Sequence, residues 1–438
     1  MARYAPIMCM REMALQTVGR TTALMVAALA GSFVVSCQAN PTGPTPRPSA
    51  NTGTAQSAEW SGSLLTLHMI TATIGWGEAF EPRLTPGPLV KRLVLRTADG
   101  GHHWQNVTPP ALSAQMAGEL PSEYLDQDRA FVMALAGPGQ IRVMRTSDGG
   151  THWQDTILHD PKVVERLSET GSAQFSFVDA NHGWLFVSYG YDGDEAGAVY
   201  KTIDGGRQWS VASRTDPNKG GGSAIPWQGA KTGITFVDQR NGWLTAATYR
   251  SKPLLYVTHD AGTSWSQVAY PDMPGIDMPG GHAVSRPRFF SPTSGEFEVL
   301  AGNSVVYTTI DGGASWRPSV SPGCCEFFFL DVNTGWALGS ISNPYSESLF
   351  GTSDSGQHWR VVHLHLDTQT QSEISQHFVT NIESLHFVNS AIGYILRDSG
   401  QPVLAVGPSP TPSAQWSQSL LRTMDGGATW TEVRSVSS

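Results

Sequence analysis

One eight-residue pattern, Thr-x-Asp-x-Gly-x-x-Trp, occurs seven times in this 438-residue chain. Its copies begin at residues 97, 146, 202, 258, 309, 352 and 423. Successive copies place their aspartates between 43 and 71 residues apart. Repeats of about this length are typical of propeller blades or of helical arrays. The repeat therefore limits the fold to a small set of architectures, and the segments between copies distinguish them.

A second pattern precedes most copies, as in FVDANHGWLF (177–186), FVDQRNGWLT (236–245) and FLDVNTGWAL (329–338). Each consists of a short apolar stretch, a turn of Asp, Asn and Gly, and another apolar stretch, which indicates a hairpin. No window of helical period and useful length follows residue 60. Each unit is thus predicted to contain four antiparallel strands, with the Asp turn between the third and fourth. The sequence predicts an all-β, seven-bladed β-propeller.

The residues that recur in every copy of the Asp turn have structural explanations. Glycine tolerates the left-handed backbone of a tight turn, and an aspartate carboxylate accepts hydrogen bonds from backbone N–H groups of its own turn. Tryptophan offers a large apolar surface for burial against the neighbouring blade. We therefore interpret these residues as structural rather than as catalytic or metal-binding: Asp99, Trp104, Asp148, Trp153, Asp204, Trp209, Asp260, Trp265, Asp311, Trp316, Asp354, Trp359, Asp425 and Trp430.

The Thr-x-Asp-x-Gly-x-x-Trp frame resembles the Asp-box, or BNR, repeat. Its pairing with the Gly-Trp pattern is similar to seven-bladed propellers of the photosystem II assembly/stability factor type. The resemblance covers residues 60–436. It implies a propeller that holds a partner without catalysing a reaction. Asp-boxes also occur in sialidases, other glycoside hydrolases and sorting receptors, so the resemblance constrains the fold more than the function.

The first residues differ in composition from the repeats. Arg11 and Arg20 precede the apolar run ALMVAALAGSFVV (23–35), which is followed by Ser-Cys. This pattern predicts a lipoprotein signal peptide over 1–36 and a lipidated Cys37, with an ordinary cleaved secretory signal as the alternative. Residues 37–59 contain little but Pro, Thr, Ser, Asn, Ala and Gly, and are predicted to be a disordered tether. We expect an exported protein, lipid-anchored on the extracytoplasmic side of a bacterial membrane.

Charge and motifs exclude several functions. The net charge is −9, and removal of residues 1–36 makes the mature chain more acidic. An acidic chain argues against nucleic-acid binding, which needs clustered Lys and Arg. No phosphate-binding loop, dinucleotide fingerprint or zinc-ligand spacing is present, so no cofactor is expected. A monomer is expected.

The face opposite the Asp turns is the expected binding surface, because propeller loops vary there. Long insertions at 77–92 and 397–417 belong to units one and seven, which ring closure makes neighbours. They contain Phe80, Arg83 and Trp416, which are candidates for binding a partner, although the insertions are equally compatible with merely tolerated loops. Trp227, in another long loop, offers a stacking surface for a sugar or a peptide.

A glycoside hydrolase is the alternative to a scaffold. A sialidase needs an arginine triad and a Tyr–Glu nucleophile, and other hydrolases need two facing carboxylates. Arg286 and Arg288 lie in a loop and are candidate binding residues, but the sequence does not show a convergence of three arginines. We therefore expect a non-enzymatic, membrane-tethered binding or assembly scaffold with a protein or glycan partner.

Two further clusters have open interpretations. Asp192, Asp194 and Glu195 suit a hard cation such as Ca²⁺, but a full ligand set is not visible, and a solvated acidic loop is the simpler reading. Cys324 and Cys325 are adjacent. Either they form a strained vicinal disulfide or they remain two reduced thiols.

Overall fold

The computed structural model describes fifteen stretches of the chain: 52–54, 58–81, 91–112, 120–137, 139–160, 173–189, 196–215, 224–248, 251–272, 283–301, 303–322, 326–340, 347–362, 379–400 and 416–437. The chain divides into two compact units, 1–50 and 51–438, and all described residues belong to the second. A search of these residues finds no helix with the length and hydropathy needed to span a membrane.

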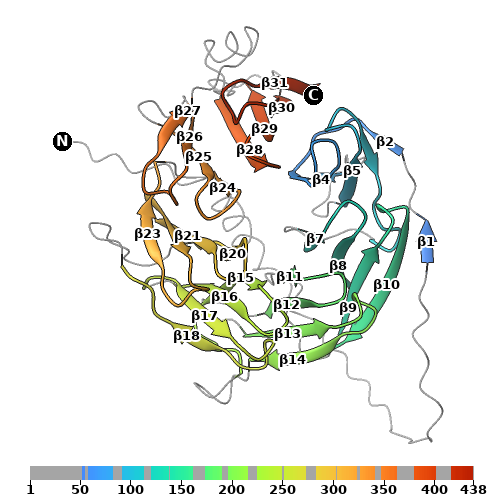
Figure 1. Cartoon of the computed structure of the whole chain (residues 1–438). Coiled ribbons are helices and arrows are strands. Elements are labelled where there is room, and N and C mark those ends of the chain that lie inside the picture. The colour runs from blue at the N-terminus through green and yellow to red at the C-terminus, as the bar shows by residue number, and fades with distance from the viewer. Residues whose placement is uncertain are drawn as a thin grey trace, which may run out of the picture. The chain divides into compact units, whose positions relative to one another are not determined.

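The described residues form seven antiparallel sheets that follow one another around a ring (Figure 1). Blade one contains β3 (Thr66–Met69), β4 (Gly75–Phe80), β5 (Arg92–Thr97) and β6 (Trp104–Asn106). Blade two contains β7 (Ser122–Tyr124), β8 (Ala130–Gly137), β9 (Gln140–Thr146) and β10 (His152–His159). Blade three contains β11 (Ala173–Phe177), β12 (Gly183–Tyr189), β13 (Ala196–Thr202) and β14 (Ser210–Arg214). Blade four contains β15 (Ala230–Phe236), β16 (Gly242–Ala247), β17 (Leu254–Thr258) and β18 (Ser266–Val268).

The remaining blades keep the same order, with one irregularity in blade five. There the innermost strand is split into β19 (Ala283–Val284) and β20 (Arg288–Phe289), followed by β21 (Gly295–Ala301), β22 (Asn303–Thr309) and β23 (Arg317–Val320). Blade six contains β24 (Glu326–Phe329), β25 (Gly335–Ser340), β26 (Glu347–Thr352) and β27 (Arg360–Val362). Blade seven contains β28 (Val379–Phe387), β29 (Gly393–Gly400), β30 (Trp416–Thr423) and β31 (Thr431–Ser437). The predicted all-β, seven-bladed propeller is confirmed.

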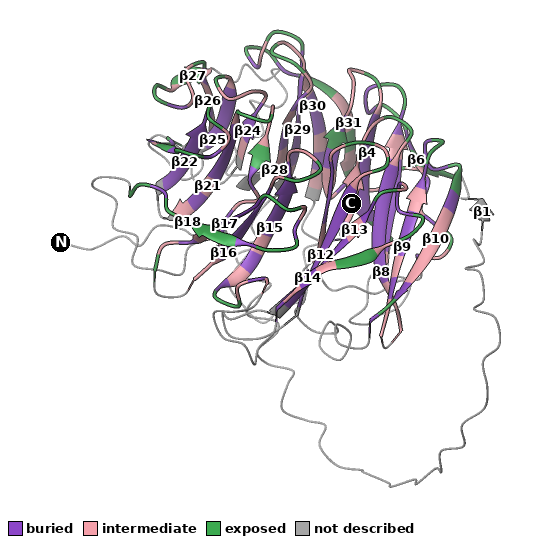
Figure 2. Ribbon diagram, turned by 60° about the horizontal axis from the view of Figure 1, so that its bottom comes forward, coloured by how far each residue is buried: buried purple, intermediate pink, exposed green. Residues whose placement is uncertain are grey.

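In every blade the first turn and the Asp turn are joined by a backbone hydrogen bond. Gly205 N donates to Asn181 O at 2.9 Å, and Gly312 N donates to Thr293 O at 2.7 Å. The equivalent bonds in the other five blades run from Gly100, Gly149, Ala261, Ser355 and Gly426. The two turns of each blade therefore lie on the same face of the ring. Figure 2 shows that the strands are mostly buried and that the turns are the exposed parts.

The blades are held together by a residue that follows the first turn. In six blades this residue is aromatic, and in five it stacks on an aromatic ring at the end of the next blade's innermost strand. The stacked pairs are Trp76–Tyr124, Phe131–Phe177, Trp184–Phe236, Trp243–Phe289 and Trp336–Phe387. Because stacked rings add to the free energy of apolar burial, these pairs fix each blade on the next. We call this position the wedge. Blade five has Glu296 there, opposite Thr308.

The ring is closed by side chains of blade seven that bond to the backbone of blade one. Gln418 accepts a hydrogen bond from Leu64 N at 2.6 Å and donates to Leu64 O at 2.9 Å. Tyr394, the wedge residue of blade seven, donates its hydroxyl to Ala72 O at 2.7 Å. The same two blades share one apolar cluster. Each of these two blades supplies its own four strands, so the described structure shares no strand across the seam. Side-chain hydrogen bonds and apolar packing hold the two blades together instead.

Part of the predicted tether is ordered. β1 (Thr52–Thr54) pairs with β10 at the outer edge of blade two, and β2 (Ala58–Trp60) pairs with β6 at the outer edge of blade one. An outermost strand leaves backbone N–H and C=O groups unpaired, which any extended segment can satisfy. Disorder was predicted from composition over 37–59, and composition does not register this kind of pairing.

Candidate functional site at the central channel

The Asp turns are pinned by the same three hydrogen bonds in all seven blades. In blade three, Thr202 Oγ1 donates to Asp204 Oδ1, and the backbone N–H of Gln208 donates to the same carboxylate oxygen, both at 2.9 Å. Gly206 N donates to Thr202 Oγ1, also at 2.9 Å. In blade six, the backbone and ring hydrogen bonds of His358 lower the pKa of Asp354 to about 2. The seven carboxylates are occupied in holding their own turns.

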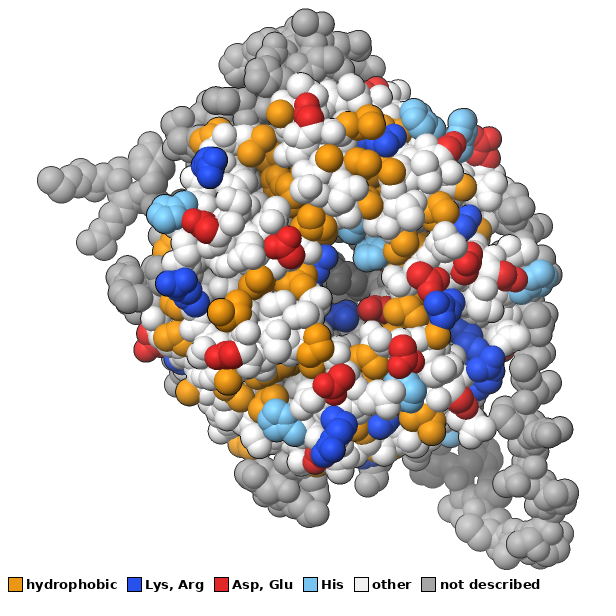
Figure 3. All heavy atoms as spheres, viewed as in Figure 1, with side chains coloured by type: hydrophobic (Ala, Val, Ile, Leu, Met, Phe, Trp, Pro, Cys, Tyr) orange, Lys and Arg blue, Asp and Glu red, His pale blue; other side chains and the backbone are white. Residues whose placement is uncertain are grey.

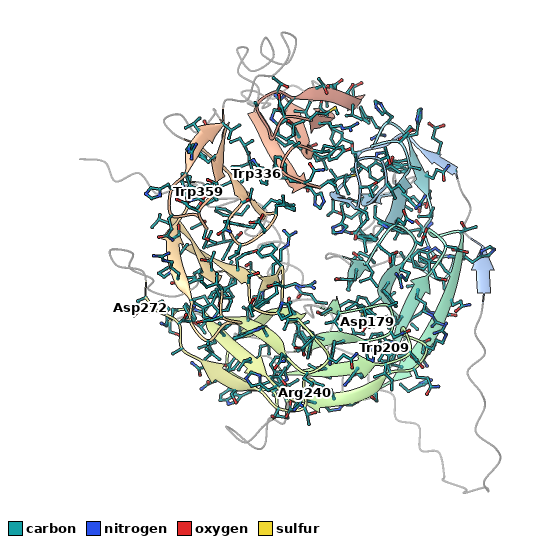
Figure 4. All side chains as sticks on the ribbon, in the orientation of Figure 1. Asp179, Trp209, Arg240, Asp272, Trp336 and Trp359 are labelled. Carbon is teal, nitrogen blue, oxygen red and sulfur yellow. The ribbon has the colours of Figure 1, made fainter. Side chains whose placement is uncertain are left out.

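The tryptophans of the Asp turns lie in or beside the cores between blades. Trp104, Trp153, Trp265, Trp316 and Trp430 are buried. Trp209 and Trp359 are half-buried. Figure 4 labels these two, together with Trp336, which lies nearer the middle of the ring.

The candidate binding residues are not all described. Arg286 and Arg288 lie together at the channel, as shown below, whereas the described aromatic candidates lie in different blades. Phe80 ends β4 in blade one, is 40% exposed and carries the Arg92 guanidinium 4.6 Å above its ring. Trp227 is also 40% exposed but precedes β15 in blade four. Trp416 begins β30, while its side chain and the whole of Arg83 lie outside the described residues.

Several other predicted sites fall outside the described residues, namely Cys37, Asp192, Asp194, Glu195, Cys324 and Cys325. Their interpretations stay predictions. Among the residues that the structure describes, no group of three His, Cys, Asp or Glu side chains is placed to hold a metal ion.

The structure reveals a layer of side chains around the channel, of which the sequence analysis identified one member, Arg288, as a candidate binding residue. In each blade one residue of the innermost strand pairs directly with the wedge residue, and it lies eight positions earlier in the chain. These seven residues are His68, Glu123, Ser176, Thr235, Arg288, Phe328 and His386. We call them the channel layer. Because the pairing register is the same in every blade, the seven positions lie at one height, toward the Asp-turn face.

Aromatic rings on one side of the channel layer contact one another from blade to blade. The His68 ring centroid lies 5.2 Å from that of His386 and 6.1 Å from that of Tyr124. His386 lies 4.9 Å from Phe328 in blade six and donates Nε2–H to Met69 O in blade one. Four blades thus contribute to one aromatic wall.

Two arginines of blade five stand at the other end of this wall. The Arg288 guanidinium lies 4.5 Å above the Phe328 ring, and the residue is exposed. Arg286 Nη1 lies 3.2 Å from Glu123 Oε2 of blade two. Blades two and five are not neighbours, so this ion pair reaches across the channel. Figure 3 shows basic, acidic and histidine side chains at the hollow in the middle of the molecule.

Arg286 is held in place by blade four. Its Nε donates to Thr235 Oγ1 at 3.0 Å, and the Thr235 hydroxyl bonds to the carbonyl of Pro287. A Cβ atom on Gly233 would lie 2.4 Å from the Arg286 Cα, so only glycine permits this approach. The break between β19 and β20 therefore presses the Arg286 backbone against blade four and directs the guanidinium into the channel.

The channel residues have shifted pKa values. His68 is exposed within the channel, where the surrounding protein atoms and the positive charges of Arg288 and Arg286 lower its pKa to about 4. Burial, His68 and Arg288 lower that of His386 to about 3, despite its bond to Met69 O. Both imidazoles are therefore neutral at pH 7. Burial raises the pKa of Glu296, the wedge residue beside Arg288, to about 7, and Arg288 opposes that rise.

A Tyr–Glu pair lies next to the channel layer, at the junction of blades one and two. Tyr124 and Ser122 both donate hydroxyl hydrogen bonds to Glu78 Oε1, at 3.1 and 2.7 Å. Arg92 lies 3.5 Å from the other carboxylate oxygen. Burial first, and then the Glu78 charge, raises the pKa of Tyr124 well above its usual value. Arg286 contacts Glu123 and Thr235, and Arg288 lies over Phe328, away from this pair.

Comparison with known proteins gives no family assignment. Neither the family models nor the curated proteins include a match to this chain. Among solved structures, YCF48 from Cyanidioschyzon merolae is similar at 16% identity and a TM-score of 0.48, over 79% of this chain and 96% of that one. YCF48 bound to D1 peptide is similar at 17% identity and a TM-score of 0.44, over 72% of this chain and 80% of that one. The Niastella koreensis GH74 enzyme is similar at 12% identity and a TM-score of 0.48, over 87% of this chain and 67% of that one. Likeness at this level does not extend to function.

Proposed function

We propose that this protein is a non-enzymatic binding scaffold that holds a protein or glycan partner at its central channel. The observation that carries the proposal is the channel layer, where five blades bring charged and aromatic side chains to one solvent-accessible place. The blades around it are fixed by stacked wedge residues, so the site is organised before a ligand arrives. A preorganised site loses little conformational freedom on binding.

The partner's outer contacts belong, in this proposal, to the face opposite the Asp turns. The long connections 77–92 and 397–417 lead from that face, and the exposed Phe80 begins the first of them. Loops on a rigid scaffold are where binding residues concentrate. The loops lie at the channel mouth opposite the Asp turns and the channel layer lies nearer the other mouth, so the proposal requires a partner that extends into the channel.

The pKa of Tyr124 weighs against a sialidase-like hydrolase. Its hydroxyl bonds to Glu78 as a Tyr–Glu nucleophile requires, but burial raises its pKa, and a tyrosine with a raised pKa is a poorer nucleophile. Arg92 lies beside Glu78, where it pairs with the glutamate itself, whereas sialidase chemistry needs three arginines around the substrate carboxylate. A glycoside hydrolase remains the alternative proposal.

We also propose that a lipid on Cys37 tethers the propeller to the extracytoplasmic side of a membrane. Support comes from the apolar run and the Ser-Cys that follows it. Replacing Cys37 by Ala should release the protein from the membrane fraction. Retention of Cys37→Ala in that fraction would contradict the anchor.

Affinity capture from native membranes, set beside a glycan array, tests the scaffold. The Arg286→Gln/Arg288→Gln variant should lose the captured partner, while Arg317→Gln, an exposed arginine on β23, should keep it. Hydrolysis of a chromogenic glycoside by the wild type, abolished in Glu78→Gln, would favour the hydrolase instead.

A further inference from the structure

We propose that the channel contains a binding site for a small carboxylate, in which Arg286 and Arg288 bind the ligand and Glu123 is the internal carboxylate that it displaces. This inference rests on the proposed function and narrows it, because it names the chemical group that the channel recognises. It follows from the contacts that fix the position of Arg286, the weakness of its ion pair with Glu123 and the charged groups around the channel.

The contacts of Arg286 with blade four direct its guanidinium toward the channel whether or not the guanidinium is paired with Glu123. The backbone is fixed against Gly233, and the Nε–Thr235 hydrogen bond orients the guanidinium plane. A guanidinium has five N–H donors. The contacts to Thr235 and Glu123 employ Nε and Nη1. One hydrogen on Nη1 and the two on Nη2 are thus the donors left for a ligand.

The contact with Glu123 is of the kind that a ligand can replace. It is a single contact of 3.2 Å, and the two side chains are 34% and 21% exposed. An ion pair with this much exposure contributes little free energy. A carboxylate that accepts two parallel N–H bonds from one guanidinium binds more strongly. A ligand that approaches Arg286 with both oxygens therefore has the advantage over Glu123.

Two arginine charges, those of Arg286 and Arg288, meet beside the channel of an acidic protein. Arg286 is paired with Glu123, and the carboxyl groups of Glu296 and Glu298 lie near enough to act on Arg288. Glu296, beside Arg288, has a pKa of about 7, so a large part of it is uncharged at neutral pH. Desolvation by the surrounding protein atoms lowers the pKa values of His68 and His386 first, and the positive charge of Arg288 lowers both further. An anion is the group that the two arginines attract.

A row of aromatic rings borders the two arginines. Phe328, His386, His68 and Tyr124 follow one another with neighbouring centroids 4.9 to 6.1 Å apart. Arg288 lies over the first of these rings. We expect a planar carboxylate to bind between the two arginines and this wall, carried either by a free dicarboxylate or by a sugar acid.

Isothermal titration of the full chain with malonate and with glucuronate tests the proposal, and malonamide and glucose serve as uncharged analogues. We expect at least one carboxylate to bind and neither analogue to do so. Malonate alone indicates a free dicarboxylate, and glucuronate alone indicates a sugar acid. Arg286→Gln should weaken binding by roughly tenfold to a hundredfold, since hydrogen bonds to charged groups are lost. Arg288→Gln gives a second test if Arg286→Gln does not fold.

Glu123→Gln is the decisive variant. A displaceable Glu123 predicts binding about two- to fivefold tighter in Glu123→Gln, in line with a weak ion pair. Glu59→Gln, on the outer strand β2, is the matched control and should leave the affinity unchanged. The proposal is overturned if neither carboxylate binds, if the analogues bind equally well, or if Glu123→Gln weakens binding. If one of these results overturns the carboxylate site but the wild type still captures its partner, the scaffold proposal is retained and only the carboxylate site is rejected.

Discussion

Trp184 of blade three stacks on Phe236 of blade four with ring centroids 3.6 Å apart and planes inclined by 5°. Its indole Nε1–H donates to Ala261 O, in the Asp turn of blade four, at 3.0 Å. Trp336 and Phe387 repeat the stack between blades six and seven at 3.6 Å and 4°. One wedge residue therefore binds both the innermost strand and the Asp turn of the next blade.

Trp184→Ala should destabilise the protein by roughly 3–5 kcal/mol, because it removes a fully buried ring and leaves a cavity at the junction. Equilibrium urea unfolding followed by fluorescence measures the change. Trp227→Ala is the control, since its ring is 40% exposed, and it should shift stability by less than about 1 kcal/mol. Equal effects of the two substitutions would contradict the wedge role.

The closing seam gives the second prediction. Gln418→Ala leaves the buried N–H and C=O of Leu64 without the side chain that bonds them. Each buried group that loses its partner costs about 1–3 kcal/mol, so we expect a loss of roughly 2–4 kcal/mol in the free energy of unfolding. Hydrogen exchange at Leu64 should accelerate with it. Gln105→Ala, at an exposed position on β6, is the control and should change neither quantity. If hydrogen exchange at Leu64 is unaltered in Gln418→Ala, the Gln418–Leu64 bonds do not close the ring.

The fold was predictable because its signals are local. An Asp turn and a Gly-Trp hairpin are each written within ten residues, and their sevenfold repetition specifies the ring. The channel layer was not predicted as a set, although Arg288 was a candidate, because its members share a position and not a residue type: His68, Glu123 and Phe328 have no chemistry in common. The constant spacing of eight residues to the wedge was the available signal. The Arg286–Glu123 pair, 163 residues apart, had no signal of its own.

The Asp turns predict acid sensitivity. Hydrogen bonds from Thr429, and also from Thr423, lower the pKa of Asp425 to about 2, and those from His358 do the same for Asp354. A depressed pKa adds stability above the ordinary aspartate value that is lost as the pH falls toward 2. The melting temperature should therefore fall between about pH 4 and 2.

The variant Asp354→Asn/Asp425→Asn tests this origin. It should melt at a lower temperature than the wild type at pH 7, and its melting temperature should fall less between pH 4 and 2. Differential scanning calorimetry across that range measures both effects. If the melting temperature of the variant falls as much between pH 4 and 2 as that of the wild type, other carboxylates cause the loss of stability in acid.

Glu296 predicts a pH dependence of the opposite sign at the junction of blades five and six. Six other wedge positions hold aromatic residues, whereas this one holds a buried carboxyl whose Oε2 has no hydrogen-bond partner among the described residues. Its pKa is about 7 in the folded protein and about 4.5 in a peptide. The folded state therefore binds a proton that the unfolded state has released, and stability falls as the pH rises from about 4.5 to 7. The effect is on the order of 1–3 kcal/mol.

The measurement is the difference in unfolding free energy between wild type and Glu296→Gln at several pH values. The difference is needed because His68 and His386, whose pKa values are depressed, make stability rise with pH over part of the same range. An uncharged amide has no such titration, so Glu296→Gln should gain on the wild type as the pH rises toward 7 and hold a constant lead above it. Glu432→Gln, exposed on β31, should track the wild type throughout. A difference that stays flat from pH 5 to 8 would mean that the carboxyl of Glu296 is not titrating at this junction.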